Sequence, residues 1–498
     1  MLEPKHRYEK MIRQAEKYCD REKSPHAFGE SYQAYYSERG KATYKGKDLT
    51  EVRSPQRQLA PDTVGSEERK PTFLRGIANK ARADKRHRFR DLYRCLNAEF
   101  LLACWADLNK DAASGVDGVT AAAYAENLEA NVGALAERLK SKRYRAKLVR
   151  RKYIPKESGK ERPLGIPALE DKLVQVACAK LLTAIYEQDF LSCSYGYRPE
   201  RGALDAVRDL TFDLQYGVYG YLVEADVKGF FDHMDQDWLL EMLSLRIDDR
   251  AFLSLIRKWL KAGILETDGQ VVHPETGTPQ GGVISPVLAN VYLHYALDLW
   301  FEKVVKPRCR GEAAIWRYAD DWVCAFRFRE DAERFYEVLP KRLKRFNLEV
   351  ALDKTRILRF SRFHPSMRRR CIFLGFEFYW MPDRQGVCRV KRRTARKRLQ
   401  GACRRIKEWI KGNRHLPGGE FFRGLNARLQ GHYNYYGVRG NSRSLYDFYK
   451  WAMECVFKWL NRRSWRRSYT WEQFNRVLEH VGIAKPRITE VRRRRVFV

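Results

Sequence analysis

The stretch Trp316 to Phe326 reads WRYADDWVCAF and places two adjacent carboxylates, Asp320 and Asp321, inside an aromatic, β-prone run. Burying two like charges side by side is costly unless a cation lies between them and a partner. The residues on either side predict a strand, a turn and a second strand. An isolated Asp-Asp pair is most often an exposed turn, so its interpretation depends on which other residues could share a cation with it.

A third carboxylate, Asp226, ends the β-like run YLVEAD, 94 positions before Asp320. Three carboxylates on neighbouring strand ends could hold two hard cations through oxygen alone. Mg²⁺ suits such a site, because it keeps several waters and completes its shell with substrate phosphates. Two such ions, roughly 3.5–4 Å apart, activate an attacking 3′-oxygen and stabilise a leaving pyrophosphate. The three aspartates therefore predict a phosphoryl-transfer site.

The charge of the 498-residue chain indicates a polyphosphate partner. It has 96 Lys and Arg against 62 Asp and Glu, a net charge of +34. Such self-repulsion stabilises no fold, but it suits nucleic acid, since neutralised phosphates release counterions. Residues 391–498 hold 28 Lys and Arg, 7 Asp and Glu and 17 aromatic residues. Interleaved cations and aromatic rings can grip a backbone and stack on bases, although the rings could equally form a helical core.

Several classes of protein are disfavoured. The 11 cysteines are scattered without a Cys-x-x-Cys pair, so we expect neither a zinc site nor a disulfide framework. The start, MLEPKHRYEK, has no apolar signal region, and no apolar run approaches membrane-spanning length. We expect a cytoplasmic protein with no membrane partner, associated with the nucleoid when on DNA.

The order of predicted elements indicates an α+β fold. Residues 91–140 are helical around a turn-rich loop at 114–120, residues 153–167 form two short strands, and residues 169–188 are helical. Further along, 219–234 begins as a strand, 277–300 is a loop entering a helix, 371–380 is a strand pair, and helical periodicity follows 394. Ser285 fits the N-cap of the helix after the loop, and Pro286 fits its first turn. Strands in the middle and helices at the end favour an α+β catalytic centre with an all-helical C-terminal lobe.

These motifs together resemble reverse transcriptases. The matching stretches are RYADDWVCAF (Tyr-x-Asp-Asp motif), EADVKGFFD (first catalytic-aspartate motif), GTPQGGVISPVLANVYL (Pro-Gln-Gly loop and helix), KERPLGIPALEDKLVQ (fingers hairpin) and FLGFEF (primer grip). More narrowly, the chain resembles bacterial group II intron reverse transcriptases, the intron-encoded maturases. That likeness rests on ASGVDGVT, on RLQGHYNYYGVRGNSRSLYDFYKWAMECVFKWLNRR and on PRITEVRRRR, and the resemblance covers roughly residues 90–495.

The resemblance implies a right-hand polymerase, with fingers and palm built on antiparallel sheet and an all-helical thumb. The implied domains are a basic N-terminal extension (1–90), fingers with the N-terminal loop motif (91–220), palm (221–385), helical thumb/maturase domain (386–480) and basic C-terminal tail (481–498).

The resemblance also implies residue roles. Asp226, Asp320 and Asp321 match the catalytic ligands of two Mg²⁺ ions. Residues matching the dNTP site are Lys156, Arg162, Phe230, Gln280 and Lys354. Phe230 is the expected gate against a 2′-OH, and Phe231 is the expected core residue, since side chains alternate along a strand. Cations expected to bind RNA are Arg404, Arg405, Lys411, Arg462, Arg463, Arg466 and Arg467.

The implied function is RNA-directed DNA polymerisation by a maturase that binds its group II intron RNA, assists splicing and copies the RNA during retrohoming. Its partners would be intron RNA, an RNA template with a DNA primer, target DNA and dNTPs. Many relatives carry a C-terminal zinc-dependent nuclease, but only eight residues follow Glu490 and no cysteine follows Cys455, so we expect no endonuclease. The alternatives are a splicing maturase with secondary polymerase activity, a reverse transcriptase used in defence or DNA repair, and an RNA-dependent RNA polymerase.

Overall fold

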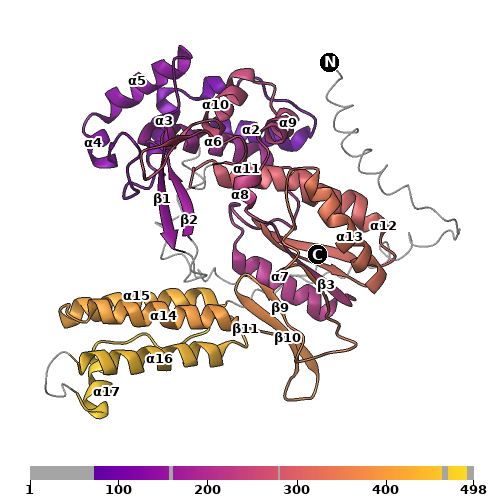
Figure 1. The fold of residues 1–498 in the computed structure, drawn as a ribbon, viewed down its shortest axis with the longest axis vertical. Coiled ribbons are helices and arrows are strands. Elements are labelled where there is room, and N and C mark those ends of the chain that lie inside the picture. The colour runs from indigo at the N-terminus through magenta and orange to yellow at the C-terminus, as the bar shows by residue number, and fades with distance from the viewer. Residues whose placement is uncertain (1–71, 156–160, 279–280, 463–468, 491–498) are drawn as a thin grey trace, which may run out of the picture. The chain divides into compact units, whose positions relative to one another are not determined.

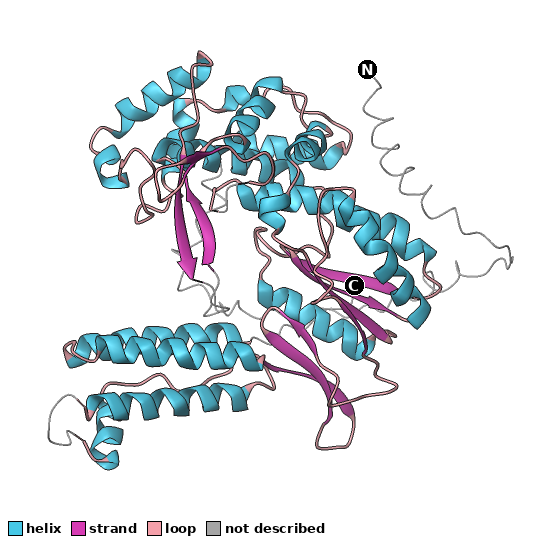
Figure 2. Cartoon of the chain, viewed as in Figure 1, coloured by secondary structure: helices cyan, strands magenta, loops and turns pink. Residues whose placement is uncertain are grey.

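A computed structural model describes residues 72–155, 161–278, 281–462 and 469–490. It confirms the expected α+β fold, with strands in the middle of the chain and helices at its C-terminal end (Figure 2). Three small sheets are present in these residues. None of the helices described is both long and apolar enough to span a bilayer.

The palm sheet has the strand order β6-β7-β3-β8, and all its neighbours are antiparallel. Its strands are β3 (Tyr221–Asp226), β6 (Ala313–Tyr318), β7 (Asp321–Phe326) and β8 (Arg356–Arg359). Side chains alternate between its two faces. Leu222, Val323 and Ala325 pack in a core that includes α7 (Ala203–Tyr216), whereas Phe326 meets Phe335 of α13 (Arg329–Lys344), with ring centroids 5.2 Å apart. Helix α7 therefore lies on one face of this sheet and α13 on the other (Figure 1).

The fingers sheet has the order β2-β1-β4-β5. Its strands are β1 (Val149–Pro155), β2 (Glu161–Ile166), β4 (Ile264–Leu265) and β5 (Val271–Val272). The antiparallel β1–β2 pair confirms the two strands predicted around 153–167. The helices that precede α13 in the chain, α7 apart, are α2 (Thr72–Ala83), α3 (Ala98–Trp105), α4 (Ala121–Ala125), α5 (Leu128–Lys140), α6 (Leu169–Tyr186), α8 (Phe230–His233), α9 (Gln236–Ser244), α10 (Arg250–Leu260), α11 (Ser285–Leu293) and α12 (Lys306–Arg308). A 3₁₀ turn spans Tyr93–Cys95.

The helix after the Pro-Gln-Gly loop differs from the prediction in two ways. Ile284, not Ser285, is the N-cap of α11, and the Ser285 hydroxyl instead meets that of Thr278 at 3.0 Å. The helix then continues through two π-helical segments, His294–Asp298 and Phe301–Val305. The first of these carries Asp298, which is fully buried.

A third sheet, the grip sheet, has the order β11-β10-β9 and leads into the thumb helices. Its strands are β9 (Cys371–Phe373), β10 (Phe376–Pro382) and β11 (Cys388–Thr394). The thumb helices are α14 (Arg396–Asn413), α15 (Gly418–Tyr436), α16 (Ser442–Leu460) and α17 (Trp471–His480). They share one apolar core, which includes Ile410, Leu425, Leu445 and Phe474. This confirms the expected helical C-terminal lobe.

Apolar and charged side chains bind parts of both flanks of the chain to the fold. Helix α2 lies within the expected 1–90 extension, yet its Leu74 and Ala81 are buried and it packs on α6. At the other end, within the expected 481–498 tail, Ile483 is buried in the thumb core. Glu490 forms a two-pronged ion pair with Arg392 of β11, at 2.9 and 2.8 Å.

Candidate active site

The palm sheet brings the three predicted aspartates to one edge. Asp226 is the last residue of β3, and its Cα partner across the ladder is Asp321, the first residue of β7. Leu222 and Ala325 are also partners and face the α7 core, so the period of two puts Asp226 and Asp321 on that same face. Asp320 lies in the two-residue turn between β6 and β7, beside Ala319, whose φ is +55°.

Electrostatics in this group favour a bound cation. Burial raises the pKa of Asp321 to about 7, and repulsion from Asp320 and Asp226 adds to the shift. Burial, and then Asp226, likewise raise the pKa of Asp320. Asp321 nevertheless keeps an exposed surface, although protein surrounds its carboxyl closely. Solvent therefore screens part of this repulsion.

Two of the predicted cations reach the aspartates. Lys354 Nζ lies 2.6 Å from Asp226 Oδ2, and this pair is open to solvent. Arg162, exposed on β2, lies close enough to Asp320 to lower its pKa. Tyr197 lies close to the same group: its φ is +57° and it is 50% exposed. Partial burial and then the charge of Asp320 raise the pKa of Tyr197, and Arg162 lowers it. Lys156 lies outside the described residues.

The two phenylalanines after Asp226 have the reverse of the expected burial. Phe230 is 2% exposed and contacts the rings of Phe231 and Tyr292, with centroids 5.3 and 6.3 Å away. Phe231 is only half-buried. The alternation argument was wrong because the strand ends at Asp226, and Gly229, at φ +51°, starts a helical turn there.

The described residues on either side of Pro279 and Gln280 contact the fingers and the palm. Gly281 has φ +113°, and a Cβ there would lie 2.6 Å from the carbonyl oxygen of Gly165 on β2, so only glycine fits this approach. Gln175 of α6 accepts a hydrogen bond from the Val283 backbone N–H at 2.9 Å. On its other side, the Thr278 N–H donates to the Phe231 carbonyl at 2.9 Å. Gln280 itself lies outside the described residues.

The turn joining β9 to β10 contacts Asp321. Phe373 and Phe376 are Cα partners, so Leu374 and Gly375 form a two-residue turn, and both have positive φ (+50° and +79°). That conformation is costly for leucine. The Leu374 N–H donates to Asp321, and its carbonyl accepts from the Tyr435 hydroxyl at 2.9 Å. A strained turn and a thumb residue therefore support Asp321.

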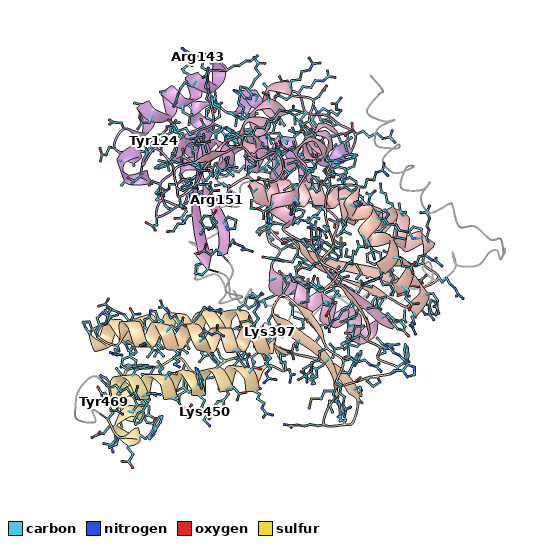
Figure 3. The ribbon with its side chains drawn as sticks, viewed as in Figure 1. Tyr124, Arg143, Arg151, Lys397, Lys450 and Tyr469 are labelled. Atoms are coloured by element: carbon cyan, nitrogen blue, oxygen red, sulfur yellow. The ribbon has the colours of Figure 1, made fainter. Side chains whose placement is uncertain are left out.

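The predicted RNA-binding cations lie on the thumb. Arg404, Arg405, Lys411 and Arg462 are all exposed, while Arg463, Arg466 and Arg467 lie outside the described residues. Lys411, Arg414 and Arg462 gather around one indole, that of Trp459, at 5.7, 5.1 and 5.4 Å from the ring centroid. Other thumb cations, such as Lys397 on α14 and Lys450 on α16, extend outward separately (Figure 3).

Sequence reasoning missed Arg317, which stands in the quoted WRYADD motif. It is completely buried beneath the Asp320 turn and pairs with Asp298. The available signal was a cation at an inward position of a β-prone strand, because such a charge requires a buried partner. Its partners come from distant segments, which the sequence alone does not bring together.

The aspartates suit divalent metal by their chemistry, although no group of three or more His, Cys, Asp or Glu side chains in the described parts of the chain is arranged to hold an ion. Asp226 is turned toward the Lys354 ammonium instead. The three carboxylates repel one another and offer only hard oxygen donors, the ligands that Mg²⁺ prefers.

Two family models match the chain. Residues 154–378 match the reverse transcriptase (RNA-dependent DNA polymerase) family, and residues 399–478 match the group II intron maturase-specific domain. Protein YkfC of Escherichia coli is 33% identical over 311 residues, which cover 55% of this chain and 78% of YkfC. The group II intron-encoded protein LtrA of Lactococcus lactis is 37% identical over 232 residues, 45% of this chain and 38% of LtrA. An uncharacterised 91 kDa protein in the cob intron of Schizosaccharomyces pombe is 40% identical over 170 residues, 34% of this chain and 21% of that protein.

Proposed function

Because the chain belongs to the group II intron reverse transcriptase and maturase family, we propose that it extends a DNA primer on an RNA template at Asp226, Asp320 and Asp321. The observation that carries this proposal is the pairing of Asp226 with Asp321 beside the Asp320 turn. The mutual repulsion of the three carboxylates, which helps to raise the pKa of Asp321, also favours a cation there.

In this proposal the three carboxylates hold two Mg²⁺ ions, which supply Lewis-acid activation of the primer 3′-oxygen and charge neutralisation at the leaving pyrophosphate. The side chains of the protein position the substrate and neutralise its negative charge. Arg162 approaches the site from β2, and Lys354 offers a second positive charge beside Asp226. Lys156 and Gln280 complete the proposed dNTP contacts, and Phe230 is the proposed gate.

The experiment is primer extension on an RNA template with Mg²⁺, comparing the parent chain with Asp320→Asn and with a chelator-treated sample. We expect the substitution and the chelator each to abolish extension with dNTPs. Extension that survives either treatment would refute the metal assignment. Preferred use of ribonucleotides by the parent chain would favour the RNA polymerase alternative.

We also propose that the thumb binds group II intron RNA and assists its folding and splicing, with the same RNA copied during retrohoming. The match of residues 399–478 to the maturase-specific domain supports RNA binding. The cations around Trp459 favour contact with phosphates. The chain covers well under half of LtrA, so the splicing and homing roles rest on this domain match and on the charge.

A second candidate is a splicing maturase in which polymerase activity is secondary. The separate match to the maturase-specific domain favours it, because that domain lies outside the aspartate site. It predicts that Asp320→Asn leaves protein-assisted splicing intact while cDNA synthesis is lost. Loss of both activities in a folded variant would count against it, and an intron RNA encoded around the gene would distinguish both from a defence or repair enzyme.

A further inference from the structure

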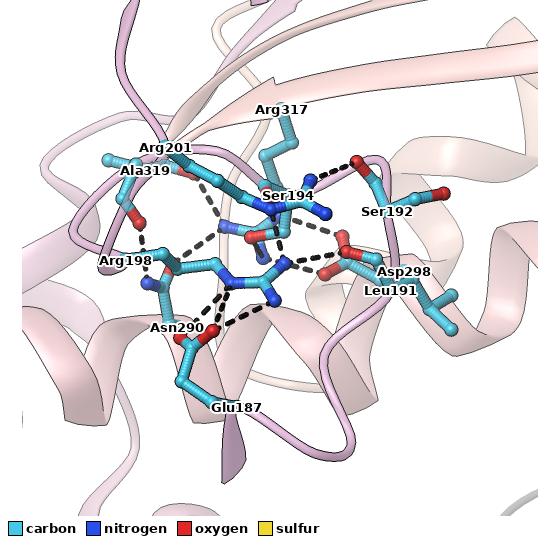
Figure 4. A network of polar contacts seen from close by, with 11 residues as sticks. Glu187, Leu191, Ser192, Ser194, Arg198, Arg201, Asn290, Asp298, Arg317 and Ala319 are labelled. Atoms are coloured by element: carbon cyan, nitrogen blue, oxygen red, sulfur yellow. Dashed lines mark hydrogen bonds and ion pairs between the residues drawn. The ribbon is translucent and has the colours of Figure 1, made fainter. Parts of the chain in front are cut away.

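All five N–H donors of the Arg317 side chain form hydrogen bonds within one buried network beneath the Ala319–Asp320 turn (Figure 4). Its Nε and Nη2 donate to the two Asp298 carboxylate oxygens at 2.7 and 2.6 Å. Nη1 donates to Asn290 Oδ1 at 3.1 Å and to the Ala319 carbonyl at 3.0 Å, and Nη2 also donates to Ser194 Oγ at 2.8 Å. Since a guanidinium has five donors, none remains unused.

The Ala319 carbonyl is the contact that reaches the active site. Ala319 has φ +55°, a conformation that an alanine keeps only when its surroundings enforce it. Its carbonyl belongs to the peptide that enters Asp320, so the hydrogen bond from Arg317 fixes the orientation of that peptide. Arg317 therefore fixes the plane of the peptide bond that joins Ala319 to Asp320.

The loop around Ser194 also contacts the turn and the Arg317 backbone. Tyr195 N–H donates to the Arg317 carbonyl, and Arg317 N–H donates to the Cys193 carbonyl, both at 2.8 Å. A Cβ on Gly196 would lie 2.4 Å from the Ala319 nitrogen, so the loop touches the turn itself. Asn290 closes the network, because its Nδ2 donates to the Gly196 carbonyl at 2.7 Å.

Asp298, the ion-pair partner of Arg317, lies in an irregular stretch of helix. Asp298 lies in the first π-helical segment after α11 and is 0% exposed, like Arg317. π-Segments inside helices are rare and occur often at functional sites. An apolar pair of similar volume would fill the same space without charge and often costs no stability, so burial alone does not account for this ion pair.

We propose that Arg317 is a positioning residue for metal binding: through the Ala319 carbonyl it sets the orientation of Asp320. The inference rests on the proposed metal role of the aspartates.

The test separates positioning from stability by removing both buried charges. Arg317→Met alone leaves Asp298 unpaired and should lower the melting temperature. Asp298→Leu combined with Arg317→Met should recover most of that loss, but it cannot restore the donor to Ala319. Arg317→Lys keeps a cation beside Asp298 with only three donors. The matched control is Asp189→Leu with Arg246→Met, which removes another buried ion pair and leaves the Ala319 contact in place.

The readouts are melting temperature, Mn²⁺ binding measured by electron paramagnetic resonance, and the Mg²⁺ concentration that gives half-maximal primer extension. For the double variant and for Arg317→Lys we expect metal affinity to fall by about tenfold or more, the usual effect of losing a partner that orients a ligand. The control pair should bind Mn²⁺ like the parent. Parental Mn²⁺ affinity in either folded Arg317 variant overturns the proposal. If Asp320→Asn also binds Mn²⁺ normally, the metal assignment itself is at fault.

Discussion

Asp226 and Asp321 are Cα partners across β3 and β7, although they lie 95 positions apart in the sequence. The antiparallel register puts both carboxylates on the sheet face that holds the α7 core and the Leu374–Gly375 turn of the grip sheet. Lys354 holds one carboxylate and the Leu374 N–H holds the other. The site is thus built from two strand ends and two loops, each of which can be tested separately.

Proton release on metal binding should depend on pH through Asp321. Its pKa is raised from 3.8 to about 7, so at pH 6 the metal-free site holds a proton that a metal must displace. We expect close to one proton released per Asp321 at pH 6 and almost none at pH 8, with screening at this exposed residue reducing the difference. Calorimetry of Mn²⁺ binding in buffers of different ionisation enthalpy measures it. Equal release at both pH values would contradict the shifted pKa.

The same shift fixes the sign of a stability effect. A carboxyl whose pKa is raised on folding stabilises the protein below its unfolded pKa, and that contribution is lost as pH rises through the folded pKa. Metal-free parent protein should therefore lose stability relative to Asp321→Asn between about pH 4 and pH 7. Melting curves in chelator across this range provide the measurement, and a gap that is constant with pH would count against the assignment.

Lys354 should affect nucleotide binding more than the chemical step. Its ammonium pairs with Asp226 in the metal-free structure and becomes available to the triphosphate once metal neutralises that carboxylate. We expect Lys354→Met to raise the KM for dNTP by about tenfold, as for loss of one charge-assisted hydrogen bond, with little change in kcat. Lys228→Met is the matched control. Lys228 lies two positions after Asp226 in the chain and forms an exposed ion pair with Glu349 instead. An equal effect in both variants would show that net charge, not position, matters.

The local parts of the site could be predicted from the sequence. The β6–β7 hairpin follows from β-prone residues around Asp320 and Asp321, and Asp226 stands where its apolar run ends. The β1–β2 pair was predictable from the turn between its strands. In each case the signal is a residue pattern within about a dozen positions, which local backbone preferences decide.

The supporting contacts could not be predicted, because they join segments that only the folded chain brings together. Arg317 draws its partners from the loop at Ser194, from Asn290 and from a π-helical turn at Asp298. Nothing local indicates a π-segment. The burial of Phe230 depends on the left-handed Gly229, which interrupts the strand pattern. The Arg392–Glu490 pair likewise joins a strand to a stretch expected to be a tail.

The gate assignment can be tested on the two phenylalanines together. Phe230 is buried, so Phe230→Ala should destabilise the protein by about 3–5 kcal/mol, whereas Phe230→Val leaves a smaller cavity. If Phe230 is the gate, Phe230→Val should raise kcat/KM for ribonucleotides relative to deoxyribonucleotides, and Phe231→Val should not. Single-nucleotide extension with both substrates measures the ratio. Relaxation by Phe231→Val alone would assign the gate to the half-buried ring.

The cations around Trp459 should contribute to RNA affinity through phosphate contacts. Lys411, Arg414 and Arg462 form no ion pair with a carboxylate within the described residues, so their charge is available to an anionic partner. We expect Lys411→Gln, Arg414→Gln and Arg462→Gln together to weaken intron RNA binding and to reduce the slope of log affinity against log salt by about two to three.

The matched control changes the same number of charges on α16, with Arg443→Gln, Lys450→Gln and Lys458→Gln, all exposed positions of the same lobe. Filter binding from low to moderate salt gives both slopes. A phosphate site at Trp459 predicts a larger loss of affinity for the first triple variant than for the second, because only there do three cations converge on one ring. Equal losses would mean that the thumb attracts RNA through its overall charge, since a diffuse field does not distinguish where three charges are removed.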